Sequence, residues 1–525
     1  MKIVRPNLLR LKSHLITLAW TMVLAGLSLT GCSKAAAPGL PAASVDPAYL
    51  NVSQLAGAAT LTNPGSSNSF AAPAPNLTAD TLARHQTGDA NFEVRFIPVT
   101  SANLSTKGAG LGPAFNNTSC LNCHSRDGRG VLPPLPAGQD RVMFGANEAL
   151  LIRISVEDGN PVPVDAAHGW GSPAAVPDFS AQLFHRGIYG LRPDSPGTGQ
   201  ADIYLHYDRS TVTFPDGHTA SLRKPVFEIE NAYDGAHSRL YQSDVHTSPR
   251  LAPSMIGLGL LEAVAEEDIL KNADPDDRDH DGISGRANQV LDLVKQAAGD
   301  QHPVSLGRFG WKASAPSLRH QVVAALSGDM GMSSRLLPQQ NIWGTTLFQN
   351  FLTSSGLNPA LFTQIDADDS LVDSLTLYSQ TLGVPIRRNA QDSNVMAGGR
   401  TFETLHCASC HTGGFVLPQG TQIAEYRGIT IYPFTDLLLH DMGEGLADRR
   451  RDFEADGQEW RTTPLWGIGV TQLVNPRAGF LHDGRARSLE EAILWHGGEA
   501  QAARDAYTKL QARDRDDLVK FLQSL

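Results

Sequence analysis

The sequence predicts a mainly α-helical protein with two similar domains, the first of which is enlarged by loops and short strands. Four segments show the helical spacing of apolar residues: 260–272, 289–298, 488–496 and 504–525. Residues 201–207 and 211–214 instead alternate as strands do, beside turn residues. The third observation is a five-residue pattern, Cys-x-x-Cys-His, that occurs twice and far apart in the chain. Two helical domains, each with one such motif, account for all three observations.

The first 31 residues have the pattern of a bacterial secretory signal. Four basic residues lie within the first twelve positions, and an apolar run from about Leu15 to Leu29 follows. The run leads into Gly31-Cys32, an ending that is similar to a bacterial lipobox and predicts cleavage before Cys32 and lipidation of its thiol. The alternative is an ordinary signal with an unrelated cysteine. Because Ser33, and not an aspartate, follows the cysteine, we expect a lipoprotein anchored in the outer membrane and facing the periplasm.

Beyond the signal, the composition predicts a tether followed by folded domains. Residues 32–78 are rich in Ala, Pro, Ser, Asn and Thr and carry little charge, which suits a flexible linker. We expect an N-terminal domain at 79–345, linker helices at 346–390 and a C-terminal domain at 391–525. The formal net charge of −11 argues against a nucleic acid as a partner. The stretch from 142 to 231 carries no motif that indicates a function.

The two Cys-x-x-Cys-His motifs are the attachment pattern of c-type haem. In that pattern each cysteine forms a thioether bond to the porphyrin, and the histidine binds the iron from one face. A thioredoxin-like dithiol and half of a zinc site are the alternatives, but neither needs a histidine directly after the second cysteine. The sequence therefore predicts two covalently bound haem c groups. Their residues are Cys120, Cys123, His124, Cys407, Cys410 and His411.

A weak internal repeat links the two halves of the chain. Residues 250–253 (Arg-Leu-Ala-Pro) and 461–464 (Arg-Thr-Thr-Pro) each lead into a glycine-containing stretch. The segments 309–318 and 480–489 both run nine positions from a phenylalanine to a leucine. Because one haem motif precedes each copy, the repeat predicts a duplicated domain.

An acidic loop lies between the two parts of the N-terminal copy. Asp277, Asp279 and Asp281 alternate before Gly282, as at the start of an EF-hand loop, where alternating side chains converge on one cation. The twelfth position of such a loop is Asn288 here, in place of the bidentate glutamate. The pattern predicts a structural Ca²⁺ site, and a solvated acidic turn is the alternative.

The chain resembles the bacterial di-haem cytochrome c peroxidase superfamily, most closely the long di-haem oxidoreductases that are labelled thiol oxidoreductases. The resemblance covers most of the chain after the signal. It is carried by four motifs, at 117–124, 279–286, 434–443 and 479–499. It implies two cytochrome-c-like haem domains and an oxidoreductase activity, whereas the thiol label finds no support because no free thiol pair remains.

The family pattern also implies a second ligand for the C-terminal haem. In relatives this ligand lies fourteen residues after the histidine of a Phe-x-His-Asp-Gly segment, and counting from His482 gives His496. An iron between His411 and His496 is six-coordinate and suited to electron transfer. Met442 is the nearest competitor. Many relatives carry methionine or tyrosine at this position, and methionine gives a haem a higher potential than histidine does.

The N-terminal haem lacks the matching ligand. Sixteen residues beyond Phe480 is His496, whereas sixteen beyond Phe309 is Ala325, which cannot bind iron. The iron held by His124 is therefore expected to be open to a small oxidant or to take a ligand from a loop, as relatives do with a movable histidine. The candidate loop ligands are His168, His185 and His206.

The resemblance implies roles for two residues and leaves one uncertain. Gln321 aligns with a glutamine that lines the distal pocket, and Trp311 with a tryptophan that relays electrons between the haems. Cleavage of a peroxide O–O bond needs an acid. Asp329 is the closest carboxylate in sequence, although it does not fall on the family's glutamate position. For Trp311 the alternative is ordinary core packing.

Together these features predict an enzyme that reduces hydrogen peroxide at the N-terminal haem. A small donor protein would supply electrons to the C-terminal haem, and Trp311 would pass them on. One alternative is oxidation of a protein or organic substrate by the same haems. The other is a pure electron-transfer cytochrome in which both irons are closed, and such a protein binds neither cyanide nor peroxide.

Overall fold

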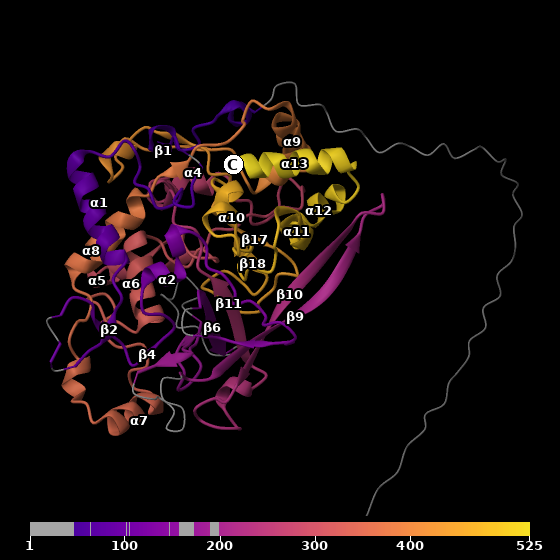
Figure 1. Ribbon diagram of the computed structural model, residues 1–525. Helices are drawn as coiled ribbons and strands as arrows, with labels where there is room; N and C mark the ends of the chain where they lie inside the picture. Colours follow the sequence, from indigo (N-terminus) through magenta and orange to yellow (C-terminus); the bar gives the residue numbers. More distant parts are fainter. Residues whose placement is uncertain are drawn as a thin grey trace, which may run out of the picture. The chain divides into compact units, whose positions relative to one another are not determined.

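The computed structural model describes residues 47–525 except 64, 101, 104–105, 146–147, 157–172 and 189–198. Residues 47–525 form one compact unit (Figure 1). Within the described residues no helix is both long and apolar enough to cross a membrane. The signal, Cys32 and His168 lie outside the described residues.

The expectation of a mainly α fold is wrong, because the chain is 32% helix and 19% strand, in many small sheets. The α-helices are α1 (Ala79–Phe92), α2 (Cys120–Cys123), α3 (Leu258–Glu262), α4 (Glu266–Leu270), α5 (Leu293–Ala297), α6 (Leu318–Met330), α7 (Thr346–Ser355), α8 (Asp369–Thr381), α9 (Ser393–Thr404), α10 (Thr471–Val474), α11 (Leu489–Trp495), α12 (Gln501–Tyr507) and α13 (Ala512–Ser524).

Most strand residues lie between the first Cys-x-x-Cys-His motif and α6. The strands are β1 (Thr60–Leu61), β2 (Ile97–Pro98), β3 (Ala109–Leu111), β4 (Ala114–Phe115), β5 (Val142–Met143), β6 (Leu150–Val156), β7 (Gln182–Leu183), β8 (Arg186–Gly187), β9 (Asp202–Thr213), β10 (Thr219–Glu230), β11 (Val245–Leu251), β12 (Gln289–Leu291), β13 (Val304–Leu306), β14 (Val384–Pro385), β15 (Phe415–Val416), β16 (Thr430–Ile431), β17 (Leu439–Asp441) and β18 (Glu459–Arg461). The pairing of β6 with β11 joins segments about ninety residues apart, which local spacing could not reveal, whereas β9 and β10 are neighbours in sequence.

Two helix pairs form the framework, α1 with α8 and α9 with α13. A glycine stands at each crossing: a Cβ on Gly88 would overlap the carbonyl oxygen of Ser374, and a Cβ on Gly398 would overlap that of Asp517. Helices approach this closely only where the contacting side chains are small. Because α8 packs on α1 as α13 packs on α9, α8 belongs with the N-terminal haem region and not with a linker at 346–390.

The predicted repeat is present in the structure. Phe309 and Ala315 form an isolated antiparallel bridge, and so do Phe480 and Ala486. A serine two residues after each bridge begins a helix, since the hydroxyl oxygen of Ser317 caps α6 and that of Ser488 caps α11. Both halves therefore contain the same closed loop and capped helix.

Part of the expected tether is folded, which differs from the prediction for residues 47–78. The side chains of Leu50, Leu55 and Phe70 are buried in the core that also contains α9 and α13. Strand β1 pairs with β14. A few widely spaced apolar residues are enough to dock this coil, and so few anchors do not change a composition that is typical of linkers.

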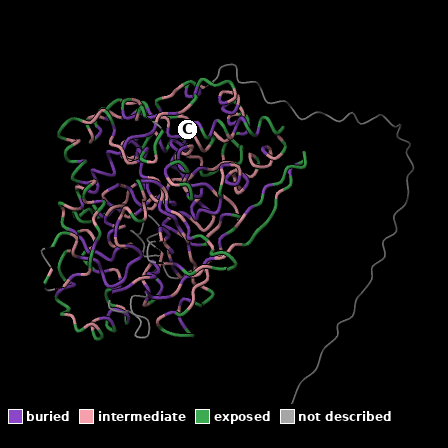
Figure 2. The backbone as a smooth tube through the Cα atoms, in the orientation of Figure 1, coloured by how far each residue is buried: buried purple, intermediate pink, exposed green. Residues whose placement is uncertain are grey.

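The sheets of the N-terminal half position two elements around the haem motifs. Strand β11 pairs with β6 over its whole length and delivers Pro253 to the first motif. Strands β9 and β10 form a long hairpin, which Figure 1 shows extending toward α11 and α12. At its tip Asp216 forms an ion pair of 2.5 Å with Arg515 of α13, and Phe214 packs against Tyr507. The outer part of the hairpin is largely exposed (Figure 2).

Three of the expected helices are different in detail. Residues 504–525 contain the end of α12 and the whole of α13. Residues 289–298 form β12 and then α5, because Asp292 caps the helix at that point by accepting from the N–H groups of Val294 and Lys295. Residues 260–272 are divided between α3 and α4. The strands expected at 201–207 and 211–214 are both part of β9.

Candidate functional site

In the N-terminal motif, Cys120 and Cys123 are the first and last residues of the single-turn helix α2. His124 comes directly after it, and its Nδ1 forms a 2.9 Å hydrogen bond with the carbonyl oxygen of Pro253. Burial lowers the pKa of His124 to about 4, so the ring is neutral. With Nδ1 as the donor, Nε2 is the nitrogen that remains available to a metal.

The C-terminal motif repeats this arrangement. The Nδ1 of His411 forms a 2.9 Å hydrogen bond with the carbonyl oxygen of Phe434, and burial lowers the pKa of His411 to about 4. Phe434 has a φ of 56°, a left-handed conformation that few non-glycine residues adopt. Strain of this kind gathers at functional sites.

The four motif cysteines are partly buried and form no disulfide. Burial is the largest cause of a rise in the pKa of Cys120 to about 12, and the charge of Asp329 adds to it. Burial also raises the pKa of Cys407 to about 12. A thioredoxin-like dithiol needs a lowered pKa, and these surroundings do not provide one.

The surroundings of both motifs fit a bulky group at each. Eleven side chains around the motifs share two properties. Burial is the largest cause of each one's pKa shift, and each still has some solvent-accessible surface. Residues around a bulky bound group have this combination, whereas Asp452, in the core, is only 5% exposed. The set comprises Cys120, Cys123, His124, Arg129, Arg153, Asp329, Cys407, Cys410, His411, Arg461 and His496.

His496 lies directly after α11 and close to His411. Its Nδ1 forms a 2.7 Å hydrogen bond with the carbonyl oxygen of Ala492, so its Nε2 is the nitrogen left for a ligand. Its charge is one of the causes that lower the pKa of His411. Met442 lies nearby, since a Cβ on Gly497 would come within 3.0 Å of its carbonyl oxygen. The side chain of Met442, however, packs into a cluster of tryptophans.

On the N-terminal side, Asp329 lies near the two thiols. Its charge raises the pKa of both Cys120 and Cys123, whereas the pKa of His124 is set by burial and by the bond to Pro253. Burial raises the pKa of Asp329 itself, and the nearby charge of Arg153 opposes this rise. The backbone carbonyl of Asp329 accepts from the N–H groups of Asn116 (2.8 Å) and Asn117 (3.2 Å), so Asp329 lies beside the segment that leads into the motif.

Gln182 joins Asp329 there, a residue that the sequence did not indicate. Its Nε2 donates to Oδ1 of Asp329 (3.0 Å) and to Oδ1 of Asn116 (2.5 Å). Because Gln182 reaches the site through β7 and a pairing with β6, no local motif could have marked it.

The two described loop histidines differ. Asn116 is hydrogen-bonded to Nδ1 of His185 (2.9 Å), and burial lowers the pKa of His185 to about 3. Its Nε2 is buried and has no hydrogen-bond partner. His206 lies on the hairpin, 3.6 Å from a carboxylate oxygen of Glu228. Only His185 is therefore connected to the Asn116–Gln182–Asp329 group.

Gln321 is not part of this group. It lies early in α6, eight residues before Asp329, and eight residues of helix span about 12 Å. Its amide oxygen is instead near Gly310, 3.9 Å from where a Cβ on that glycine would lie. The structure thus separates two of the residues that were expected to share one pocket.

Trp311 is buried and connects to the N-terminal motif through the backbone. Its Nε1 donates a 2.7 Å hydrogen bond to the carbonyl oxygen of Leu251. Two residues later in the chain, Pro253 accepts the bond from His124. Two hydrogen bonds and three residues of backbone therefore link the indole to the imidazole.

From Trp311 an aromatic path leads toward the second motif. The ring of His482 lies edge-on to Trp311, with centroids 6.5 Å apart, and stacks on Trp460 at 3.8 Å and 11°. Trp460 pairs with His440 across β17 and β18. The Nδ1 of His440 is 3.5 Å from the sulfur of Cys410. Trp460 lies in no motif, so its place in this path depends on the fold alone.

His440 is held between two carboxylates. Its Nε2 is 2.8 Å from Asp436, and its Nδ1 is 2.6 Å from Glu499. Burial opposes protonation, but these bonds raise the pKa well above its usual value, so the ring is charged at neutral pH. The hydroxyl of Ser284, at the end of the acidic loop, donates to Glu499 (2.6 Å) and ties that loop to this side.

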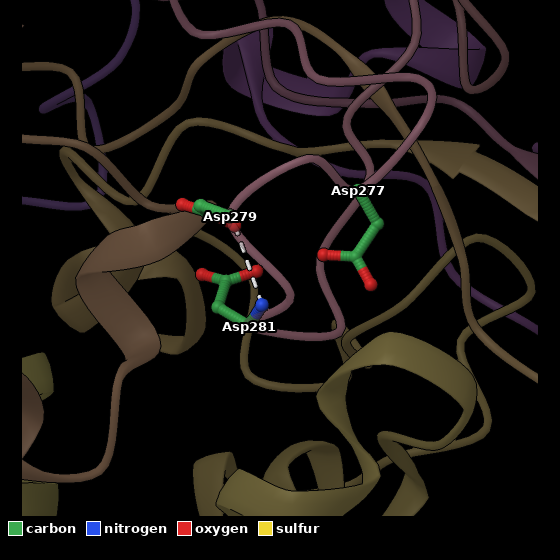
Figure 3. Close-up of side chains that lie close together, drawn as sticks. All are labelled: Asp277, Asp279 and Asp281. Carbon is green, nitrogen blue, oxygen red and sulfur yellow. Dashed lines mark hydrogen bonds between the residues drawn. The ribbon is translucent and has the colours of Figure 1, made fainter.

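The acidic loop brings three carboxylates together. Ligand oxygens of Asp277, Asp279 and Asp281 lie within 4.8 Å of one another (Figure 3). Gly282 has a φ of 85°, as a sharp turn requires. Asn288 does not complete the loop, because its amide donates to the carbonyl oxygen of Lys312 (2.7 Å) in the core. A Ca²⁺ ion there would take its remaining ligands from carbonyl groups or water.

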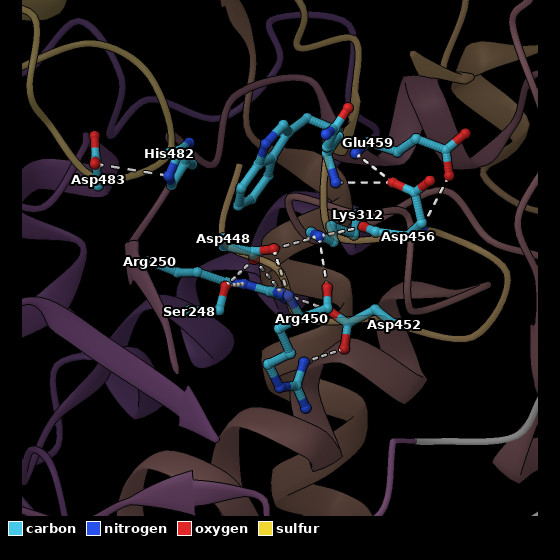
Figure 4. A network of polar contacts seen from close by, with 12 residues as sticks. Ser248, Arg250, Lys312, Asp448, Arg450, Asp452, Asp456, Glu459, His482 and Asp483 are labelled. Carbon is cyan, nitrogen blue, oxygen red and sulfur yellow. Dashed lines mark hydrogen bonds and ion pairs between the residues drawn. The ribbon is translucent and has the colours of Figure 1, made fainter. Parts of the chain in front are cut away.

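A buried network of charges contains Lys312, Arg250, Asp448 and Asp452 (Figure 4). The Nζ of Lys312 is 2.7 Å from Asp448 and 4.7 Å from the centre of the Trp460 ring. Arg250, at the end of β11, is paired with Asp452 at 2.6 Å. Because Lys312 and Arg250 come from the N-terminal half and both aspartates from the C-terminal half, the network joins the two haem regions.

Comparison with known proteins agrees with this arrangement. The sequence matches the family described as "Di-haem oxidoreductase, putative peroxidase" over residues 49–525. A comparison with curated proteins finds no match. The matched span contains both motifs, both helix pairs and the network between them, and the chain therefore belongs to the di-haem oxidoreductase family.

Proposed function

We propose that this oxidoreductase reduces hydrogen peroxide at a haem bound to Cys120, Cys123 and His124, and that electrons arrive through a haem bound to the second motif. The observation that carries the proposal is the asymmetry of the two sites. A second histidine lies near His411, whereas an acid, an amide and an arginine lie near the thiols of the first motif.

The second motif supplies the features of an electron-transfer site. His411 and His496 each bond a backbone carbonyl through Nδ1 and leave Nε2 for the iron. Two imidazole ligands close an iron to substrates while leaving it able to exchange electrons. We assign His496, and not Met442, as the second ligand.

The first motif supplies the features of a peroxide site. A bound haem supplies the iron that exchanges electrons with peroxide. Because burial raises the pKa of Asp329, its carboxyl is suited to hold a proton and to donate it to the departing oxygen. Gln182 fixes the orientation of that carboxyl, and Arg153 adds positive charge beside it. Overall, one peroxide takes up two electrons and two protons and yields two molecules of water.

Trp311 is proposed as the relay between the sites. Its bond to Leu251 leads to His124, and its contact with His482 leads through Trp460 to His440, beside Cys410. Gln321, near Gly310, lies beside this relay and not beside Asp329, so we assign it no role in proton transfer.

The wider setting is proposed from the sequence. We infer thioether attachment at all four motif cysteines and a lipid anchor at Cys32, which places the enzyme on the periplasmic face of the outer membrane. A small soluble protein is the inferred electron donor. A Ca²⁺ ion at Asp277, Asp279 and Asp281 would brace the loop that holds Glu499 through Ser284.

Electron paramagnetic resonance of the diferric protein, before and after one added electron, tests the proposal. We expect a low-spin signal that is lost in His496→Ala, and in at least one state a second iron that binds cyanide. Two low-spin irons that bind no cyanide, either before or after one electron is added, would identify an electron-transfer cytochrome. Cyanide binding without peroxide reduction would favour a protein or organic substrate.

A further inference from the structure

Two arginines beside Trp311 are enclosed by protein and have no carboxylate partner. Burial lowers the pKa of Arg129 and of Arg461 to about 10. Arg129 donates to the carbonyl oxygen of Leu481, and its Nε is buried without a partner. Arg461 donates to the carbonyl oxygens of Gly310 (3.0 Å) and Thr462 (2.9 Å). Neither forms an ion pair with any residue that the structure describes.

The carboxylates whose charges reach these arginines are already occupied. Asp483, whose charge raises the pKa of Arg129, is bonded to Arg485 at 2.7 Å. Asp436, whose charge raises the pKa of Arg461, is bonded to His440 at 2.8 Å. An enclosed guanidinium is costly unless an anion accompanies it. The protein side of each site therefore lacks an anion.

The positions of the two arginines assign one to each haem motif. Arg129 lies five residues after His124 and 5.1 Å from the centre of the Trp311 ring. The backbone N–H of Arg461 donates to the carbonyl oxygen of Trp311 (2.9 Å). The charge of Asp436 raises the pKa of Arg461. The backbone N–H of Asp436 donates to the carbonyl oxygen of Cys410 (3.0 Å), which connects Arg461 to the second motif. Both arginines thus hold the same tryptophan from opposite motifs.

We propose that Arg129 and Arg461 bind the propionate carboxylates of the two haems, Arg129 that of the N-terminal haem and Arg461 that of the C-terminal haem. A guanidinium fork matches a carboxylate in shape and charge. The two haems are thereby anchored on the segment that carries Trp311. The proposal rests on the presence of two haems and is independent of the peroxide reaction.

Reduction potentials of the two haems test the assignment, measured by spectroelectrochemistry without peroxide. Loss of a cation beside a haem favours the ferric form. We expect Arg129→Gln to shift the N-terminal haem about tenfold toward the ferric form, a fall of about 59 mV for a one-electron couple. We expect Arg461→Gln to shift the C-terminal haem by a similar factor, and each variant to leave the other haem within twofold of the wild type.

Arg387 provides a matched control. Burial also lowers its pKa to about 10, it too has no carboxylate partner, and its Nη2 is buried without a partner as the Nε of Arg129 is. Its other two nitrogens bind the carbonyl oxygens of Tyr49 and Leu50 and the hydroxyl of Ser524, all outside both motifs. We expect Arg387→Gln to leave both potentials unchanged. Equal shifts in this control would show that the effect comes from loss of any buried cation and would overturn the proposal.

Potentials that stay unchanged in Arg129→Gln and Arg461→Gln, in folded protein with two haems, would also overturn it. If a glutamine variant lacks a haem, the lysine variant at the same position is measured in its place. The readout is then the bending vibration of the haem propionates in the resonance Raman spectrum. Lysine cannot reproduce the fork, so this vibration is expected to move for the matching haem alone. A vibration identical to that of the wild type contradicts the assignment.

Discussion

The two haem regions share a framework and differ in the length of one helix. In each region, a phenylalanine four residues after the crossing glycine lies against the histidine of the motif: Phe92 is 6.2 Å from His124, and Phe402 is 6.4 Å from His411. In each, a bridged loop leads to a serine-capped helix. The N-terminal helix α6 has 13 residues, whereas the C-terminal helix α11 has 7.

Because α6 is longer than α11, different side chains lie near the two Cys-x-x-Cys-His motifs. Helix α11 ends at Trp495, and the extended backbone beyond it presents His496 near His411. Helix α6 continues through Ala325 and brings Asp329 near the thiols of the first motif. A duplicated scaffold can therefore present different side chains to its two motifs when the end of one helix moves.

Among the variants that test this comparison, Asp329→Asn has the largest expected effect, because it changes the proposed acid at the N-terminal motif. Loss of a positioned proton donor is expected to reduce the rate of peroxide reduction by about 10²–10⁴-fold, as for other acid catalysts. Steady-state kinetics with peroxide and an artificial electron donor measures this rate. Cyanide binding to the N-terminal haem serves as the control for an intact site. A rate within threefold of the wild type would remove Asp329 from the reaction.

Lys312→Met tests the junction between the regions. It leaves Asp448 buried without its cation, and removing one partner of a buried pair typically costs about 3–5 kcal/mol of unfolding free energy. Denaturant unfolding followed by far-UV circular dichroism measures the change. Lys271→Met, which breaks an exposed pair with Asp268, is the control and is expected to leave the midpoint unchanged. Equal midpoints for both variants would mean that the network is not needed for stability.

Calcium is expected to stabilise the folded protein through the acidic loop. At a free concentration one hundred times its Kd, Ca²⁺ would stabilise the protein by about 2.7 kcal/mol, because it binds only the folded loop. Thermal unfolding with and without a chelator measures this effect. Asp279→Asn should abolish it, and a calcium effect that survives in that variant would place the ion elsewhere.

A carboxyl in the N-terminal region should make stability depend on pH. Burial is the main cause that raises the pKa of Asp127 to about 7, and the hydroxyl of Tyr378 donates to it (2.8 Å). Between about pH 4 and pH 7 the folded protein then holds a proton that the unfolded chain has lost, so this group lowers stability as pH rises. In Asp127→Asn the slope against pH should change by up to about 1.4 kcal/mol per unit. Unfolding at several pH values measures the slope, and identical slopes would contradict the shift.

Local patterns in the sequence predicted the parts of the site that depend on neighbouring residues. The motifs at 120–124 and 407–411 were found from short spacings, and His496 from its distance to His482 in the family pattern. Gln182 and Trp460 could not be found in this way, because β7 and β18 bring them to the site through pairings with distant strands. Gln321 was named from the family alignment and Asp329 as the closest carboxylate in sequence, and the axial rise of α6 separates the two.

The fold class failed for the same physical reason. Strand β11 forms only because β6 lies beside it, about ninety residues earlier, and hydrophobic spacing within either segment does not reveal the partner. The prediction of a flexible tether did not anticipate the folding of residues 47–78, because this segment docks on a surface formed by distant parts of the chain. Leu50 and Leu55 find that surface in helices more than three hundred residues away.

That docking has a consequence for the order in which the chain folds. The core around Leu50 also contains Phe521 and Leu525, so the first described segment and the last share one interior. Closing a loop of several hundred residues costs about 5 kcal/mol of chain entropy, and contacts this distant in sequence form late. The segment from Tyr49 to Phe70 therefore cannot reach its final place until Phe521 and Leu525 have been made.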